Sequence, residues 1–193
     1  MSFWRSAPTT IQPHTTPDWW VSFALPTNEW HVSNKIGTRN IIAGDVWLAN
    51  RAQLLQQLQL SGRTDLEIVA ALWERHGEGC LPMLQGMFAF VVWDDVQKSL
   101  WLVRDRVGAR TLYYSTAGAT RWIAPRLRTI AEKLAPTIDP VALRDYLCCA
   151  FVPGERTMWQ GIRELRPGTI LRLPAGERFQ FWEISEQLDD DVH

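Results

Sequence analysis

Hydrophobic residues recur along the chain at two spacings, one typical of strands and the other of helices. β-Branched and aromatic residues are concentrated at 19–25, 30–33 and 38–48, and polar breaks between them predict successive antiparallel strands. Apolar runs at 87–93 and 100–103 flank a largely polar turn and predict a hairpin inside a sheet. Shorter strands are predicted at 112–115, at 122–124 and in two pieces within 168–182.

Helical spacing appears in four segments. Residues 51–60 carry Leu54, Leu55 and Leu58 on one helical face. The next helix, 65–76, is preceded by a capping box in which Thr64 stands three residues before Glu67. Further helices are predicted at 126–134 and at 140–150, the latter with Asp139 as its N-cap and Pro140 at its first position, and a short helical turn is predicted at 80–84.

The order of these elements predicts an α+β fold. Strands fall into two groups with a pair of helices between them, which favours segregated sheets and helices over a βαβ repeat. The pattern leaves open whether one sheet is covered by helices or two sheets are stacked. We expect an irregular or extended arm at 1–18, one domain at 19–182 and a frayed acidic tail at 183–193.

Composition narrows the possible classes of function. The 193 residues are 46% hydrophobic and 21% charged, which suits one globular domain, and a net charge of -1 argues against a nucleic-acid partner. Cys80, Cys148 and Cys149 form an odd set with two adjacent members, so neither a disulfide framework nor a metal site is expected. No apolar run is long enough for an export signal or a membrane span. We therefore expect a cytoplasmic protein without a cofactor.

Several motifs then occur in a recognisable order. Residues 64–69, 73–81 and 84–94 resemble the run "S/T-D-x-E-V/I … W-G-x-x-C-L … L-x-G-M-F-A-F-x-x-W-D" of the asparagine synthetase family. Residues 104–114 are similar to its "A-R-D-R-x-G-x-K/R-P-L-Y-Y", with Thr111 where proline is usual. The similarity continues through "T-x-F-x-G-I-x-x-L-x-P-G" at 157–168 and a closing aromatic pair at 181–182.

This resemblance covers about residues 45–182 and is to the N-terminal, glutamine amidotransferase half of the family. It implies a four-layer αββα sandwich of two antiparallel sheets, the N-terminal-nucleophile (Ntn) hydrolase fold. The family's synthetase half would begin shortly after Trp182, where the chain ends, so we expect a domain that stands alone. The implied ancestral chemistry is glutamine hydrolysis by a cysteine that removal of Met1 exposes, with its own α-amino group as base.

The family's opening Cys-Gly-Ile is replaced here by Ser2-Phe3-Trp4. A serine at a freed N-terminus can act as a nucleophile, but Ser2 lacks the following glycine that lets the chain turn tightly. We therefore favour an ordinary residue over a catalytic one. The family's "H-R-G-P-D" string, whose arginine binds the glutamine carboxylate, is absent, and Arg39 is a weak replacement.

Two alignments are possible for the family's "N-G-E-I-Y-N" segment, which supplies an oxyanion donor, a glycine that allows close approach and a carboxylate side chain. One matches Gly44 and Asp45 to its Gly-Glu but requires an insertion. The other matches Asn50 to the closing asparagine without a gap and places Asp45-Val46-Trp47 at Asn-Gly-Glu. We prefer the ungapped alignment, in which the side-chain amide and the glycine are both lost and Trp47 would fill or block the pocket.

Asp65 matches the carboxylate that the family uses for the substrate's ammonium group. As the first residue of a helix, it is equally well explained by the helix dipole. Arg104 and Asp105 are interpreted as a structural salt-bridge corner.

Three functions follow from these comparisons of residues. The favoured one is a catalytically degenerate domain that acts as a binding or regulatory subunit, docking on a protein partner such as a separate synthetase. The alternative is a glutaminase that supplies ammonia to such a synthetase, with Ser2 as nucleophile. A third possibility is a sensor that binds glutamine or another amino acid through Asp65. Assembly into a homo-oligomer is compatible with each.

Overall fold

The computed structural model describes residues 9–11, 21–23, 31–33, 40–94, 96–116 and 121–183. The N-terminal candidates Ser2 and Arg39 and most of the acidic tail lie outside these ranges. The strands are β1 (Thr9–Ile11), β2 (Val21–Phe23), β3 (His31–Ser33), β4 (Asn40–Leu48), β5 (Gly86–Asp94), β6 (Ser99–Arg104), β7 (Tyr113–Ser115), β8 (Ile123–Ala124), β9 (Ile162–Glu164), β10 (Thr169–Leu173) and β11 (Glu177–Gln180). The helices are α1 (Arg51–Leu58), α2 (Asp65–His76), the 3-10 helix η1 (Gly77–Met83), α3 (Leu127–Leu134) and α4 (Pro140–Cys149).

Two antiparallel sheets form the centre of the molecule. The larger has the strand order β11-β10-β6-β5-β4-β3 and the smaller has the order β8-β7-β9. The longest pairing joins β4 and β5, in register from Asn40 opposite Asp94 to Leu48 opposite Gly86. The hairpin predicted between 87–93 and 100–103 is confirmed as β5 and β6. A separate pair, β1 and β2, completes the described strands.

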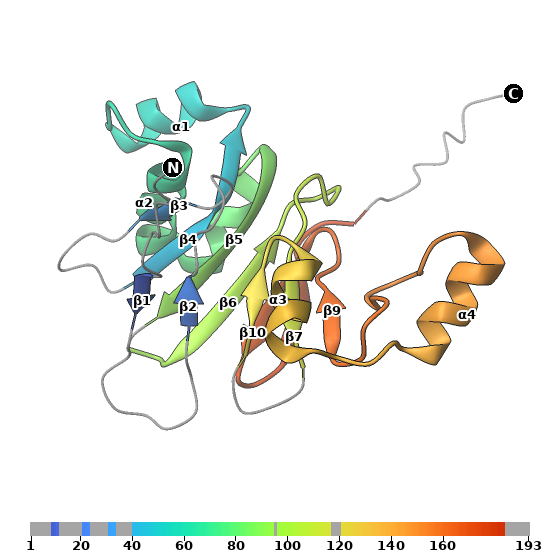
Figure 1. Cartoon of the computed structure of the whole chain (residues 1–193). Helices are drawn as coiled ribbons and strands as arrows, with labels where there is room; N and C mark the ends of the chain where they lie inside the picture. The colour runs from blue at the N-terminus through green and yellow to red at the C-terminus, as the bar shows by residue number, and fades with distance from the viewer. Residues whose placement is uncertain are drawn as a thin grey trace, which may run out of the picture.

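Four layers result from the alternation of side chains along the central strands, since successive residues face opposite sides of a sheet. One face of the larger sheet packs against α1 and α2 through Phe88, Phe90 and Val92. The other face packs toward the smaller sheet through Ala89 and Val91. α3 covers the far side of the smaller sheet (Figure 1). The predicted α+β fold with an αββα order of layers is thus confirmed.

α2 begins where the capping box predicted. Glu67 N–H donates to Thr64 Oγ1 at 3.3 Å, and Thr64 N–H donates to Glu67 Oε2 at 2.8 Å. That backbone hydrogen bond is the main reason why the pKa of Glu67 is lowered. The N-cap of α4 is also confirmed, because Asp139 Oδ1 accepts from the N–H of Val141 at 2.9 Å.

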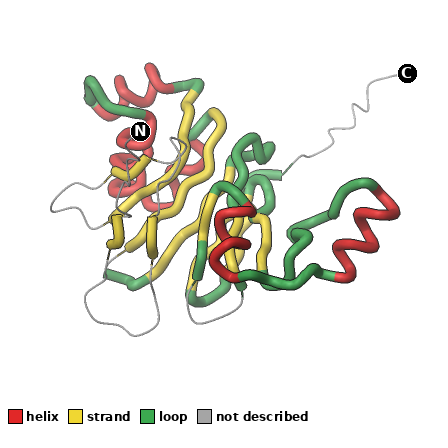
Figure 2. Tube along the Cα trace, in the orientation of Figure 1, coloured by secondary structure: helices red, strands yellow, loops and turns green. Residues whose placement is uncertain are grey.

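α4 projects away from the sandwich on two loop segments (Figures 1 and 2). Only Ala142 of this helix is buried. Large apolar side chains elsewhere on α4 and just after it are exposed, and they are Val141, Leu143, Tyr146, Leu147 and Phe151. A helix that is apolar around most of its circumference is normally covered by other protein.

Two strands add to the predicted pattern. Thr9–Ile11, in the segment expected to be irregular or extended, pairs with Val21–Phe23. β9 was not predicted, because it has three residues and only Ile162 is buried. Within the described residues, the helices are all too short or too polar to cross a bilayer.

Candidate functional site

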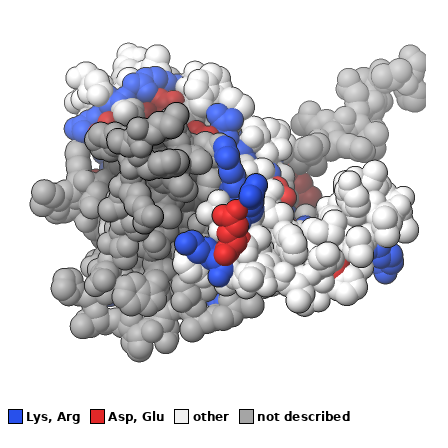
Figure 3. Space-filling view, viewed as in Figure 1, with Lys and Arg blue, Asp and Glu red and all other residues white. Residues whose placement is uncertain are grey.

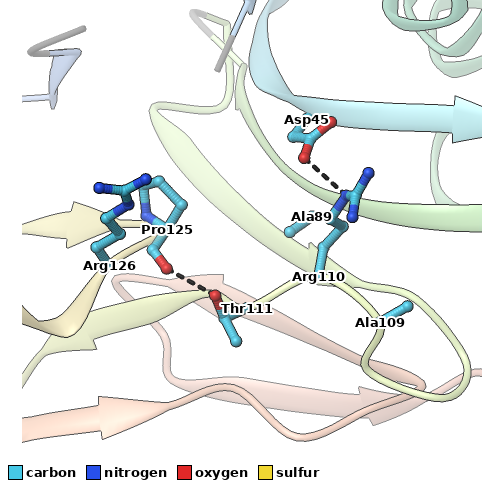
Figure 4. Close-up of a pocket in the computed structure, with 7 residues that line it drawn as sticks. All are labelled: Asp45, Ala89, Ala109, Arg110, Thr111, Pro125 and Arg126. Atoms are coloured by element: carbon cyan, nitrogen blue, oxygen red, sulfur yellow. Dashed lines mark hydrogen bonds and ion pairs between the residues drawn. The ribbon is translucent and has the colours of Figure 1, made fainter. Parts of the chain in front are cut away.

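A cavity of about 370 Å³ lies where β4 and β5 face the loop before β7 and the connection before α3. Its lining comes from four separate parts of the chain (Figure 4). The lining residues are Asp45, Ala89, Ala109, Arg110, Thr111, Pro125 and Arg126. Small side chains therefore leave a space that two arginines and one carboxylate border.

The sheet register places Asp45 in this cavity. Asp45 lies two residues after Ala43 on the face of β4 that looks toward the smaller sheet. It stands opposite Ala89 of β5, another residue of that face. Asp45, which the sequence predicts to be a binding residue, therefore lines a cavity. Its role in substrate binding stays a prediction.

Gly44 precedes Asp45 but has a packing role. A Cβ atom on Gly44 would lie 2.4 Å from Cβ of Phe90 and 2.5 Å from the carbonyl oxygen of Ala89. No side chain fits at this position while β5 keeps its place. Trp47, expected to fill or block the pocket, is 49% exposed and is not among the lining residues.

A buried aspartate holds the loop that carries Arg110. Asp105 is fully buried, and its carboxylate accepts from the N–H groups of Val107 at 3.1 Å, Ala109 at 2.9 Å and Arg110 at 3.0 Å. It also accepts from Phe88 N–H at 3.3 Å, which ties the loop to β5. A carboxylate with several such bonds fixes the backbone on both sides of the cavity.

Arg104 holds the same loop from its other side. Its Nε donates to the carbonyl oxygen of Arg110 at 2.7 Å, and its Nη2 donates to that of Gly108 at 3.0 Å. Arg104 and Asp105 form a structural corner, as the sequence predicted, but they do not form a salt bridge with each other. Arg104 pairs instead with Glu164 of β9, at 2.8 Å.

Two of the cavity's three charged residues, Asp45 and Arg110, form an ion pair. Arg110 Nε lies 2.7 Å from Asp45 Oδ2, and the two side chains are 38% and 30% exposed. Arg126 borders the cavity on the other side of Thr111, whose hydroxyl donates to the Pro125 carbonyl oxygen at 2.7 Å (Figure 4). Figure 3 shows basic and acidic side chains next to one another on the face of the molecule in that view.

Asp65, the third predicted binding residue, lies outside the cavity. Its Oδ2 accepts from Leu48 N–H at 2.8 Å, and its Oδ1 pairs with Arg51. The carboxylate is only 14% exposed. It therefore joins the start of α2 to the end of β4.

The cysteines do not approach the cavity. Cys80 is buried beneath α2, and burial raises the pKa of its thiol to about 12. Cys148 and Cys149 are exposed on α4. Because a thiolate is the reactive form, Cys80 is a structural residue.

Comparison with known proteins identifies the family. The profile of the glutamine amidotransferase domain matches residues 36–182, which is well over half of the chain. The chain belongs to this family. The predicted resemblance to the amidotransferase half of asparagine synthetases is thereby confirmed.

Relatives of this glutamine amidotransferase domain are much longer proteins. "Amidase chry2" of Gibberella zeae is 30% identical over 154 residues, which are 77% of this chain and 22% of that protein. "Asparagine synthetase [glutamine-hydrolyzing] 1" of Bacillus subtilis is 28% identical over 144 residues, 71% of this chain and 22% of that protein. The chain thus spans about a fifth of the length of these relatives.

A solved structure supports the fold. Glutamine phosphoribosylpyrophosphate amidotransferase from B. subtilis matches with a TM-score of 0.51 and 20% identity, over 79% of this chain and 31% of that chain. At this identity the match bears on the fold alone, and it agrees with the Ntn-type sandwich.

Proposed function

We propose that this amidotransferase domain does not hydrolyse glutamine and acts as a binding or regulatory subunit for a synthetase-type partner. The observation that carries the proposal is the environment of Asp65. The resemblance assigns this position to the substrate's ammonium group, yet both carboxylate oxygens already have partners within the domain, Leu48 N–H and Arg51. A substrate would have to displace a partly buried ion pair to bind there.

The chemistry of the cavity supports the same proposal. Nucleophilic hydrolysis needs an activated hydroxyl or thiol beside the substrate and donors that stabilise the oxyanion. Among the described residues that line the cavity, Thr111 carries the one hydroxyl, and its proton is directed to the Pro125 carbonyl. The two arginines suit binding of an anion better than activation of a nucleophile.

The partner is inferred from the relatives and from α4. In the asparagine synthetases that match, about four fifths of the protein lies outside the matched region. Leu143, Tyr146 and Leu147 of α4 are exposed. Exposed apolar surface of this kind is a common feature of protein interfaces. We infer that α4 contacts a synthetase-type domain or subunit.

A second candidate function is glutamine hydrolysis with Ser2 as nucleophile. Two observations support it: the chain belongs to the glutamine amidotransferase domain family, and one of its relatives is named as an amidase. In this alternative, removal of Met1 frees the α-amino group of Ser2, which then takes the hydroxyl proton.

One assay distinguishes the two functions. Intact mass first establishes whether Met1 is removed, and ammonia release from L-glutamine is then compared for wild type, Ser2→Ala and the matched control Ser6→Ala. Our proposal expects all three proteins to remain at the background rate. Ammonia release by wild type and Ser6→Ala, with loss in Ser2→Ala, would establish the second candidate.

A further inference from the structure

We propose that the surface where β9 meets β7 and the segment after α4 binds a small molecule through a phosphate group, and that Arg163 is the residue that holds it. β9 lies between β7 and the segment that leads back from α4 (Figure 1). The residues of this site are not among those that line the cavity beside Asp45. The inference goes beyond the proposed function and does not depend on it.

The first observation is an arginine without a partner. Arg163 lies in β9 and is partly buried. Within the residues that the structure describes, its guanidinium forms no ion pair and no hydrogen bond, whereas Arg156 and Arg178 each pair with a carboxylate. A partly buried charge has lost some of its hydration, so an oppositely charged ligand stabilises it more than it would a fully exposed one.

The second observation is a like charge opposite Arg163. An isolated antiparallel bridge joins Arg163 to Arg156. Side chains that are directly opposite each other start about 5 Å apart on one face, and like charges in this arrangement are destabilising. Arg156 is paired with Asp139 at 3.3 Å, but no carboxylate among the described residues pairs with Arg163. An anion that contacts both guanidinium groups would relieve their repulsion.

The third observation is a buried hydroxyl whose proton is not used. Tyr114 of β7 stands opposite Arg163 in the sheet register and is only 3% exposed. Its oxygen accepts from Arg178 Nη2 at 2.8 Å, and no described residue accepts its hydroxyl proton. Burial raises the pKa of Tyr114, so the hydroxyl keeps this proton at neutral pH. Arg178 and Arg163 act on that pKa in the opposite direction, so both guanidinium groups lie near the hydroxyl.

The charge of the cluster selects the ligand. Glu155 pairs with Arg178 and lies 3.8 Å from Arg166, so one carboxylate faces two guanidinium groups. With the unpaired Arg163, two positive charges are in excess. A phosphate ester carries roughly 1.5 to 2 negative charges at neutral pH, whereas a carboxylate carries one. Phosphate also has enough oxygens to accept from two guanidinium groups and from the Tyr114 hydroxyl at once.

The experiment is calorimetric titration of the full chain with three probes. Inorganic phosphate and glycerol 2-phosphate distinguish free phosphate from a phosphate ester, and acetate tests whether any anion is sufficient. Binding is measured for wild type, Arg163→Ala, Arg163→Lys, Tyr114→Phe and Arg128→Ala. The last is a matched control, because Arg128 pairs with Glu132 on the exposed surface of α3.

We expect at least one phosphate probe to bind wild type and Arg128→Ala alike, and acetate to bind on the order of tenfold more weakly or not at all. Affinity for phosphate should fall on the order of tenfold to a hundredfold in Arg163→Ala. The loss should be smaller in Arg163→Lys, which keeps the charge without the planar fork, and severalfold in Tyr114→Phe, which removes one donor.

Three results would overturn the inference. They are the absence of binding of both phosphate probes at millimolar concentration, equal affinity of Arg163→Ala and wild type, and binding of acetate as tight as that of phosphate. Thermal melts show whether each variant is folded. Because Arg163→Lys and Tyr114→Phe keep side chains of similar size, weaker phosphate binding at an unchanged melting temperature separates a lost contact from a folding defect.

Discussion

Arg110 Nε and Asp45 Oδ2 lie 2.7 Å apart and join the loop before β7 to the strand β4 in the lining of the cavity. The contact links two segments that are far apart in the chain. It also depends on Asp105, which holds the backbone of Arg110. The stability of the domain and the shape of its cavity are thus coupled through one loop.

Asp105→Ala should destabilise the domain strongly. The substitution leaves the buried N–H group of Phe88 and the partly buried N–H groups of Ala109 and Arg110 without their acceptor. Each such loss costs about 1–3 kcal/mol, so the free energy of unfolding should fall by roughly 3 kcal/mol or more. Urea denaturation measures the change, and Glu132→Ala on the surface of α3 should stay within about 0.5 kcal/mol of wild type. A loss no larger than that of Glu132→Ala would show that Asp105 does not hold the loop.

Gly44→Ala should also be destabilising, for a steric reason. The added methyl group would lie 2.4 Å from Cβ of Phe90, so β4 and β5 would have to separate. Overpacking of this kind costs about 1–3 kcal/mol. Gly79→Ala is the matched control, since nothing lies within 4 Å of the position that its added methyl group would take. Equal melting temperatures for the two variants would contradict the close approach of β5.

The three cysteines should differ in reactivity toward iodoacetamide. At pH 8, Cys148 and Cys149 should be alkylated in the native protein, whereas Cys80 is buried and the pKa of its thiol is raised to about 12. Intact mass should show two adducts before unfolding and three after it. The variant Cys148→Ser/Cys149→Ser should show no adduct before unfolding. Rapid labelling of Cys80 in that variant would contradict the burial of its thiol.

Cys80 should also make the stability of the domain depend on alkaline pH. Its thiol stays protonated in the folded state up to about pH 12, whereas in the unfolded chain it ionises near its ordinary pKa of 9.0. The unfolded state is therefore favoured increasingly as pH rises above 9.0, and stability falls. Denaturation midpoints of wild type and Cys80→Ala between pH 8 and 10.5 measure this effect. The wild type should lose more stability over this range, and parallel losses would contradict the prediction.

Leu147 tests whether α4 packs on its own domain. Leu147 is 76% exposed on α4, so its replacement should leave the thermal midpoint nearly unchanged. Leu112→Ala, at a fully buried position, should cost about 2–5 kcal/mol. Sedimentation of the purified variants tests whether α4 also joins copies of this chain. A marked loss of stability in Leu147→Asp would show that α4 packs on its own domain.

Elements whose signals are local could be predicted from the sequence. The capping box at Thr64 and the leucine spacing before it gave α1 and α2 nearly residue by residue. The hairpin of β5 and β6 was equally clear, because both strands are continuous apolar runs. Four layers followed from the family resemblance and not from periodicity.

The site was harder to predict because its parts meet only through tertiary structure. Asp45 was identified, but its partner Arg110 comes from a loop and Arg126 from the start of a helix, and no spacing relates the three. Arg104 was assigned to the right corner with the wrong partner, since Glu164 reaches it only when β9 pairs with β7. Long-range register of this kind is not visible in one sequence.

The most direct test of the proposed role is the rate of ammonia release from L-glutamine by the purified wild-type protein, after intact mass has shown the state of Met1. We predict a rate equal to that of the buffer background. Release above that background, abolished by Ser2→Ala and retained by Ser6→Ala, would contradict the proposed role and make this domain a glutaminase.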